Sequence, residues 1–296
     1  MSCQGQPLPL AFVSRDFDET VIGNFMKKKY LALSQFIGKP ETSVLYYSAA
    51  DFNDLFNRIA SQPGAAGIKV HFATWCPTGV PAVDNIVMSG YKDLLTLVFV
   101  PVDLNGKEIE KFFIVNPTGG VLELTHDAAS QLVRAFLKIK LPLLQEIIYD
   151  AGRPDFTETH SLYYELEKFN GPYGLIKEMD AQGAAGMAVF IGSYAKDTTK
   201  PGPGRITYPI GWQLTVIFEF AKTLNYNGID YLYHFDIEDT GGFNTRTPAP
   251  ATPSKTVSPA AYSVNEVYGG DTANPCPPPN PCSSTLGLIR SVLGQS

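Results

Sequence analysis

The 296-residue chain has few of the residues that redox, metal and nucleic-acid chemistry depend on. It contains four cysteines, four histidines and two tryptophans, and its formal net charge is −6 at pH 7. An acidic chain has no cationic field to attract nucleic acid, so we expect no nucleic-acid partner. The cysteines are too few and too scattered for a disulfide scaffold.

The sequence also lacks a long hydrophobic run. No stretch reaches the roughly 18 apolar residues of a membrane-spanning helix. The first residues carry neither the basic segment nor the apolar core of a signal peptide. We therefore expect no membrane span and a cytoplasmic location, with export by a route that needs no N-terminal signal left open.

An internal repeat is the most informative feature that the sequence does contain. Five blocks between residues 13 and 121 align, in the same order, with five blocks between residues 124 and 243, with 25 identities in 65 positions. The offset between aligned residues drifts only from 111 to 122. Average composition alone would give roughly four identities. We interpret the chain as a tandem duplication of one unit. The three clearest blocks are Val13–Lys29 with Leu124–Lys140, Glu41–Asn53 with Glu158–Asn170, and Gly64–Trp75 with Gly183–Tyr194.

Each unit is predicted to begin with two helices. Apolar residues at helical spacing follow the N-cap residues Ser14 and Thr125. A second helix is predicted over Ala49–Ala60 in the first unit and over Leu175–Ala181 in the second. A Gly-Ala-Ala-Gly sequence then ends each second helix and precedes a strand, so we interpret it as a turn and not as a phosphate loop.

Three strands are predicted to follow in each unit. Apolar residues alternate with others from Ile68 and, in the second copy, from Met187. A loop rich in Gly and Pro comes next, then a second apolar strand, and an Asn-Gly turn leads into a third, over about 110–115 and 232–237. We therefore expect an α+β fold in which two units, each of two helices and a three-stranded antiparallel meander, pack as a pseudo-two-fold pair. Whether the two sheets join edge to edge or stack is left open.

Four segments result: an N-terminal arm (1–12), repeat unit 1 (13–122), repeat unit 2 (123–243) and a tail (244–296). The tail holds nine prolines in 53 residues, which predicts an extended segment. Its end carries apolar residues at helical spacing, so we expect a short helix that docks on the body or on a neighbouring copy. These residues are Leu286, Ile289, Val292 and Leu293.

The segment Val70–Gly79 resembles the active site of the thioredoxin family, in which an apolar strand runs into Ala-Thr-Trp-Cys-Pro. Such a site holds a reactive thiolate at a helix N-terminus. Gly79 occupies the place of the second cysteine, and Val80–Asp84 is predicted to be a loop and not a helix. We therefore interpret Cys76 as a structural or incidental thiol at a strand end.

No other pattern predicts a catalytic residue, a cofactor or a metal site. No two histidines have ligand spacing. Asp230, His234, Asp236 and Glu238 share one face of a predicted strand, which we interpret as a solvated face and not a cation site. Whether Cys276 and Cys282 pair is left open. Trp75 and Tyr194, at equivalent strand ends, are candidates for lining a binding groove, because such side chains favour places where one end is wet.

Two strands of the first unit resemble those of an uncharacterised group of bacterial proteins. That group pairs a "G-[VI]-R-[VI]-Y-[FY]" strand with an "L-T-L-[VI]-x-V-P-T-D" strand and often ends in a tail rich in Pro and Cys. Here the matching segments are Gly67–Ala73 and Leu94–Asp103, with Lys69, His71 and Val102 as departures. The second copy has Glu219 at the residue before the expected proline. The resemblance supports the fold and implies no activity.

The function favoured by these patterns is a non-enzymatic interaction or assembly protein. It would use a pseudo-dimeric body and an extended C-terminal arm that engages another protein or a second copy. The alternative is a small-molecule binder or enzyme with a site between the loops 76–93 and 195–212.

Overall fold

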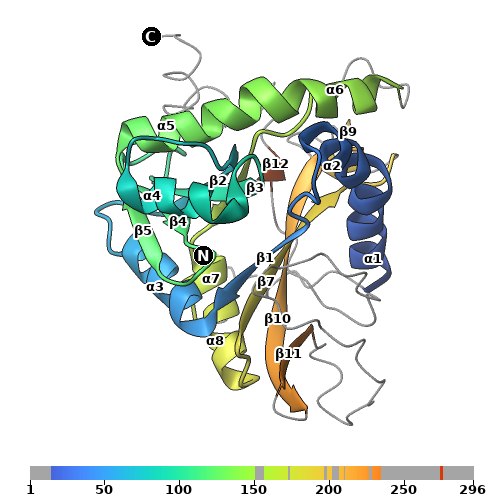
Figure 1. The fold of residues 1–296 in the computed structure, drawn as a ribbon. Helices are drawn as coiled ribbons and strands as arrows, with labels where there is room; N and C mark the ends of the chain where they lie inside the picture. Colours follow the sequence, from blue (N-terminus) through green and yellow to red (C-terminus); the bar gives the residue numbers. More distant parts are fainter. Residues whose placement is uncertain are drawn as a thin grey trace.

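The fold is α+β, with two main antiparallel sheets, in a computed structural model of the chain (Figure 1). The structure describes residues 15–150, 157–172, 174–196, 199–201, 207–209, 211–226, 229–234 and 274–275. The predicted N-cap Ser14 and the terminal segment 286–293 lie outside these ranges.

The elements of the first half run in chain order from a helix to a three-strand meander. They are α1 (Arg15–Asn24), η1 (Phe25–Tyr30), α2 (Leu31–Ile37), β1 (Val44–Ser48), α3 (Ala49–Ala60), β2 (Gly67–Thr74), α4 (Pro81–Ile86), η2 (Val87–Tyr91), β3 (Leu95–Val102), β4 (Phe112–Val115) and β5 (Val121–Leu124).

The second half follows a similar order. Its elements are α5 (His126–Ala135), η3 (Phe136–Lys140), α6 (Leu141–Asp150), β6 (Ser161–Glu165), α7 (Glu167–Asn170), α8 (Leu175–Ala181), β7 (Gly186–Ser193), β8 (Thr199–Pro201), β9 (Thr207–Pro209), β10 (Leu214–Tyr226), β11 (Ile229–His234) and, from the tail, β12 (Asn274–Pro275).

Each half opens with a helix whose middle turn is a π-helix. α1 continues through η1 into α2, and α5 continues through η3 into α6. Thr125 caps α5 as predicted, because its hydroxyl oxygen accepts a hydrogen bond from the backbone N–H of Ala128 at 3.2 Å. Each π-helical turn buries one phenylalanine and one lysine four positions apart: Phe25 with Lys29, and Phe136 with Lys140.

The two sheets exchange strands between the halves of the chain. One sheet has the order β1-β7-β10-β11, and the other has the order β12-β6-β2-β3-β4-β5. Strand β1 of the first half thus pairs with β7 of the second, and β6 of the second half pairs with β2 of the first. Neither half therefore completes its own sheet.

The two exchanged pairings have the same register. In one, Leu45 lies opposite Val189, and in the other Leu162 lies opposite Val70. Leu45 and Leu162 are 117 positions apart, and Val70 and Val189 are 119 apart, as in the sequence alignment. The remaining four residue pairs of β1 with β7 match those of β6 with β2 in the same way. The pairing of β2 with β3 likewise matches that of β7 with β10 over eight residue pairs.

One face of each sheet contributes to a shared core. This core includes Val70 and Phe99 from one sheet and Val189 and Phe218 from the other, together with side chains of α3 and of the π-helical turns. The Tyr164 ring contacts the Phe218 ring across the two sheets, with centroids 5.6 Å apart. The sheets therefore do not join edge to edge, which answers the question that the sequence left open.

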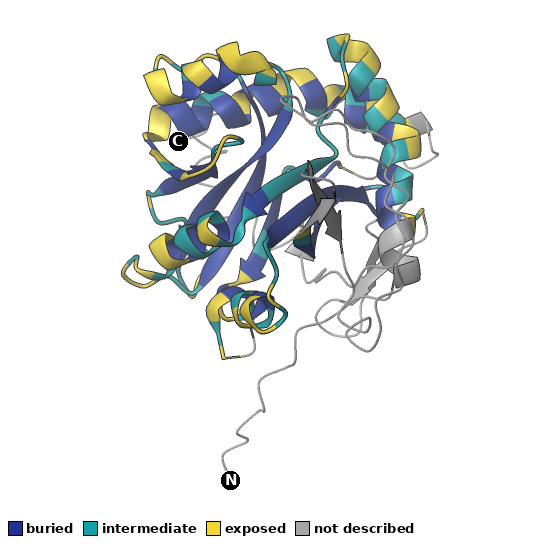
Figure 2. Cartoon of the chain, turned by 60° about the horizontal axis from the view of Figure 1, so that its bottom comes forward, coloured by how far each residue is buried: buried dark blue, intermediate teal, exposed yellow. Residues whose placement is uncertain are grey.

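The outer face of each sheet is covered by the opening helix of one half. Val21 and Ile22 of α1 pack on the sheet of β7 and β10, and Leu132 and Val133 of α5 pack on the sheet of β2 and β3. Burial accordingly increases from the helices toward the strands (Figure 2).

Several predicted elements are confirmed, and others need correction. The second helices match α3 (Ala49–Ala60) and α8 (Leu175–Ala181) in their bounds. The prediction of a loop over Val80–Asp84 is wrong, because Pro81 begins α4; proline is favoured in a first helical turn, where its missing N–H has no partner to lose. The expected three-strand units omitted β1, β5 and β6.

Candidate functional site

Two buried lysine–glutamate pairs join the halves of the chain. Lys29, at the end of the first π-helical turn, binds Glu158 of the second half. Lys140, at the end of the equivalent turn, binds Glu41 of the first half. The side chains of all four residues are fully buried. The contacts are reciprocal: each half provides the lysine for the other half's glutamate.

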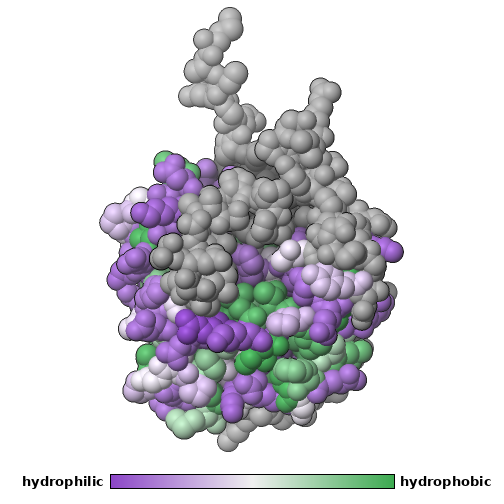
Figure 3. Space-filling view, turned by 90° about the horizontal axis from the view of Figure 1, so that it is seen from above, coloured by the Kyte–Doolittle hydropathy of each residue, from purple (hydrophilic) through white to green (hydrophobic). Residues whose placement is uncertain are grey.

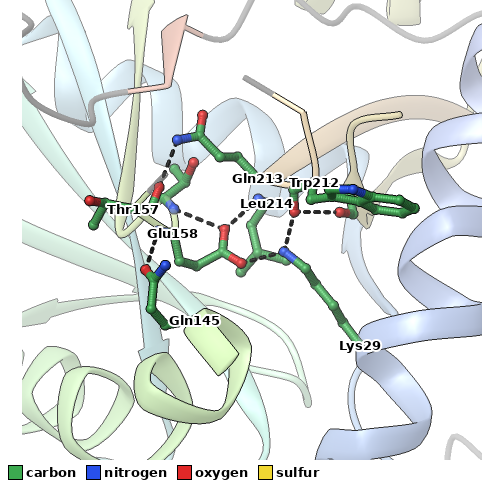
Figure 4. A network of polar contacts seen from close by, with 9 residues as sticks. Lys29, Gln145, Thr157, Glu158, Trp212, Gln213 and Leu214 are labelled. Carbon is green, nitrogen blue, oxygen red and sulfur yellow. Dashed lines mark hydrogen bonds and ion pairs between the residues drawn. The ribbon is translucent and has the colours of Figure 1, made fainter. Parts of the chain in front are cut away.

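Each carboxylate is held by the same set of backbone donors. Glu158 accepts the N–H of Thr159 at 2.8 Å and the N–H of Leu214 at 2.6 Å on the oxygen that does not face the lysine (Figure 4). Glu41 accepts the N–H of Thr42 at 2.8 Å and that of Leu95 at 2.7 Å. A carboxylate with this many donors is satisfied when ionised.

A side chain from the opening helix positions the backbone of each glutamate. The Ser34 hydroxyl oxygen accepts the N–H of Glu41 at 3.0 Å, and the Gln145 amide oxygen accepts the N–H of Glu158 at 2.7 Å (Figure 4). Ser34 and Gln145 are 111 positions apart, the same offset that relates Lys29 to Lys140. Equivalent positions of the two opening helices thus support the two glutamates, although the supporting residue is serine in one half and glutamine in the other.

The backbone beside each pair also takes the same rare conformation. Asp93 and Trp212, which are 119 positions apart, are the two described non-glycine residues with positive φ, at 66° and 67°. The carbonyl of Trp212 accepts hydrogen bonds from Lys29 and, at 2.7 Å, from the Ser193 hydroxyl. A residue seldom adopts this conformation unless its surroundings require it. In both turns the backbone N–H bonds to a carbonyl at the equivalent strand end, Asp93 to Trp75 at 2.8 Å and Trp212 to Tyr194 at 3.1 Å.

Burial sets the electrostatics of both lysines. Desolvation lowers the pKa of Lys29 and of Lys140, and in each case the partner carboxylate opposes this by stabilising the ammonium. A buried ion pair contributes little net stability, because its attraction is offset by the cost of desolvating two charges. Removing one partner is costly, however, since it leaves a buried charge without its counter-ion. Each pair should therefore tolerate the replacement of both partners better than the loss of one.

A second polar cluster lies on the outer face of the sheet that contains β2. Lys69 and His71 of β2 both contact one oxygen of Glu108 at 3.2 Å, and all three side chains are buried. The equivalent positions of β7 carry Ala188 and Phe190, which pack in an apolar cluster. The halves thus differ in chemistry here although their strand registers match.

His160 lies next to this cluster and has a strongly altered pKa. Burial lowers its pKa to about 4, and electrostatic interactions with His71 and Lys69 add to the shift while Glu108 opposes it. The folded protein therefore keeps this imidazole neutral at pH values where the unfolded chain, with a pKa near 6.5, binds a proton.

We expect acid to weaken the fold through this histidine. Between about pH 6.5 and about pH 4, the imidazole binds a proton in the unfolded chain but not in the folded protein. The free energy of unfolding therefore falls by about 3 kcal/mol over this range. Urea unfolding across this pH range measures the slope. His160→Gln should flatten it, whereas His126→Gln, at an exposed histidine, should not. An equal slope in the His160→Gln variant contradicts the assignment.

Cys76 lies at the edge of an open hollow of about 560 Å³ that Gln131, Arg134 and Lys138 also line. Its sulfur is 3.6 Å from the carbonyl oxygen of Gln131. Burial raises the pKa of the thiol to about 11, and the negative charges of Asp93 and Asp84 add to the shift. Although a short helix does follow Cys76, the environment disfavours the thiolate that a thioredoxin-like reaction requires.

We expect Cys76 to react slowly with iodoacetamide. A pKa near 11 leaves a far smaller thiolate fraction at pH 7 than that of a free cysteine, and the higher nucleophilicity recovers only part of the loss. The rate should be about 20-fold or more below that of a model thiol. The measurement requires Cys3, Cys276 and Cys282 replaced by serine. A rate at or above the model value would mark Cys76 as an activated thiol.

The binding residues predicted from the sequence are not brought together among the described residues. Trp75 and Tyr194 are both buried, at 1% and 3% exposure. Trp75 packs on the outer face of one sheet and Tyr194 on the outer face of the other. Leu286, Ile289, Val292 and Leu293 lie outside the described residues, as do Asp236 and Glu238.

Sequence reasoning missed the two ion pairs, although the alignment contained a signal for them. Lys29 and Lys140 are identical in the aligned blocks, and so are Glu41 and Glu158. An opposite pair of charges kept at both copies, beside buried strands, points to a paired contact. Spacing alone gives no indication that each pair crosses between the halves.

Known proteins add nothing to this site, because no family model, curated protein or solved structure matches the chain. In the described part of the chain, no group of three or more His, Cys, Asp or Glu side chains is placed to hold a metal ion. Within the same ranges, no helix combines the length and the apolarity that crossing a bilayer requires.

Proposed function

We propose that the chain is a tandem duplication whose two units pack as a pseudo-two-fold pair, and that it is a non-enzymatic interaction or assembly protein. The observation that carries the first part is reciprocity. Lys29 binds Glu158 while Lys140 binds Glu41, and β1 pairs with β7 while β6 pairs with β2. Reciprocal contacts of this kind are those of a two-fold symmetric dimer, here within one chain.

The contacts of the buried charged residues support a structural and not a catalytic role. Four fully buried charged residues are used in contacts between the halves, and Lys69 contacts Glu108. The thiol at position 76 is held protonated by its surroundings. Trp75 and Tyr194, which a site between the loops 76–93 and 195–212 would bring together, pack on different sheets. These placements favour an interaction role over the small-molecule alternative.

An exposed apolar face supports an interaction role further. Apolar side chains gather near the centre of the face that is seen from above (Figure 3). The helices on this side of the molecule, at the top of Figure 1, carry several large apolar residues in contact with solvent. Leu31 and Phe36 of α2 are 54% and 58% exposed, and Ile139 and Tyr149 are also exposed. Contiguous exposed apolar surface marks a site of protein contact.

The C-terminal arm is the second element of the proposal. Deleting residues 244–296 from the full chain tests it. We expect the truncated protein to keep the cooperative unfolding of the body but to lose self-association in light scattering, or to lose the partner captured by the full chain. An unchanged mass together with unchanged capture contradicts a binding role for the arm.

A further inference from the structure

The two edge strands β1 and β6 have the same sequence core and the same setting. Both contain Leu-Tyr-Tyr, at 45–47 and at 162–164. In both, the first tyrosine lies close to the glycine that begins the neighbouring strand: a Cβ on Gly67 would lie 2.6 Å from the Tyr163 ring, and one on Gly186 would lie 2.8 Å from the Tyr46 hydroxyl. The two strands therefore present equivalent outer edges.

The outer edge of β6 is occupied. Asn274 lies opposite Tyr163, and Pro275 lies opposite Leu162. The carbonyl of His160 bonds to β2, and bonding alternates along an antiparallel strand, so Leu162 faces β2 while Tyr163 turns its N–H and C=O outward. Asn274 thus takes the hydrogen-bonded position and Pro275 the position that needs no N–H. An Asn-Pro sequence fits this edge because proline falls where its missing donor costs nothing.

The outer edge of β1 is the equivalent site. The carbonyl of Ser43 bonds to Ile191, so by the same alternation Tyr46 turns its N–H and C=O away from β7. Within the described ranges, β1 pairs with β7 alone. A strand edge with unpaired backbone groups is a template for another extended segment.

The tail contains the Asn-Pro sequence that pairs with β6, and it repeats this sequence once further along. Asn-Pro-Cys occurs at 274–276 and again at 280–282, with three prolines between the two. The chain thus has two equivalent edges and two equivalent Asn-Pro sequences. Three successive prolines form a stiff, extended spacer. This spacer therefore separates the two Asn-Pro sequences along the chain, and the second can pair with an edge of its own.

We propose that the free edge of β1 binds Asn280–Cys282 of a second copy of this chain. The tail then holds its own body through Asn274–Pro275 and a neighbouring body through the second Asn-Pro sequence. Backbone hydrogen bonds between Tyr46 and Asn280 would carry the contact, as those between Tyr163 and Asn274 do on β6. This inference rests on the proposed assembly function and names its partner and its contact.

Photo-crosslinking from position 46 tests the contact in the full chain. Tyr46 is replaced by p-benzoylphenylalanine, which keeps an aromatic ring at this position, and light protein is mixed with ¹⁵N-labelled protein before irradiation. We expect crosslinked peptides that join position 46 of one isotope to residues 280–282 of the other. The same probe at position 163 is the matched control and should give crosslinks to 274–275 within one isotope.

Two point variants test the backbone geometry by light scattering. Asn280→Pro removes the N–H that would pair with Tyr46, and we expect self-association to weaken at least 10-fold. Pro281→Ala changes the position that needs no donor, and we expect a change of less than 3-fold. Crosslinks from position 46 confined to a single isotope, or none to 280–282, overturn the contact with a second copy. If truncation of 244–296 still abolishes capture of another protein, the proposed function survives that result.

Discussion

Glu158→Leu is expected to lower the free energy of unfolding by about 3–5 kcal/mol at pH 7. The variant leaves the Lys29 ammonium fully buried without its counter-ion, although it still donates a hydrogen bond to the Trp212 carbonyl. Lys29→Met should cost a similar amount, because Glu158 then keeps its backbone donors but loses its buried ion-pair partner. Urea denaturation followed by circular dichroism measures both values.

The double variant Lys29→Met with Glu158→Leu should recover most of this loss. Replacing a buried ion pair by apolar side chains of similar volume is often neutral or stabilising. An exposed pair provides the control: Arg58 and Asp54 are 2.9 Å apart with side chains 44% and 43% exposed, so Arg58→Ala should cost less than about 1 kcal/mol. A loss at Lys29 no larger than that at Arg58 would show that the buried pair is not formed.

Residues 1–122 expressed alone are expected not to fold to a native state. This fragment leaves β2 without its β6 neighbour, Glu41 without Lys140 and β1 without the strand β7 with which it pairs. The loss includes one side of a core that both halves build, which is far more than a single substitution removes. The fragment should show no cooperative urea transition when it is monomeric.

Mixing this fragment with residues 123–296 should restore a cooperative transition and a one-to-one complex. Because the contacts of the two halves are reciprocal, each fragment provides what the other lacks. Size-exclusion chromatography with light scattering follows the complex. A monomeric 1–122 fragment that unfolds cooperatively with native-like stability contradicts the exchange of strands and lysines.

Hydrophobic periodicity predicted the elements that are amphipathic. In α3, Phe52, Leu55, Phe56 and Ile59 form one buried stripe, and its bounds were predicted correctly. β2 was recognised by alternation although both of its faces are buried. There the second face is filled by Lys69, His71 and Ala73, which read as polar or small in the sequence.

Strands β1 and β6 were missed for a physical reason. Each is five residues long and continues directly, or after one residue, into a helix, so it has no turn signal of its own. Ser48 ends β1 and also caps α3, since its side chain accepts the N–H of Asp51 at 3.1 Å. What makes these segments strands is the edge of a sheet provided by the other half, which local sequence does not encode.

The ion pairs illustrate the same limit at the candidate site. Identity at Lys29 and Lys140, and at Glu41 and Glu158, is readable in the sequence. The sequence does not show that these residues are buried or which partner each one binds, because both depend on which half of the chain each helix covers. Surface lysines and glutamates are far more common than buried ones, so charge alone predicts exposure.

Four double-mutant cycles test the central claim, the reciprocal docking of two equivalent halves. The crossed pairs Lys29 with Glu158 and Lys140 with Glu41 are predicted to couple by roughly 2 kcal/mol or more in the free energy of unfolding, as residues in direct contact do. The uncrossed pairs Lys29 with Glu41 and Lys140 with Glu158 are predicted to add within about 0.5 kcal/mol. Strong coupling in the uncrossed pairs, with additivity in the crossed ones, would mean that each half binds its own lysine and would contradict the account.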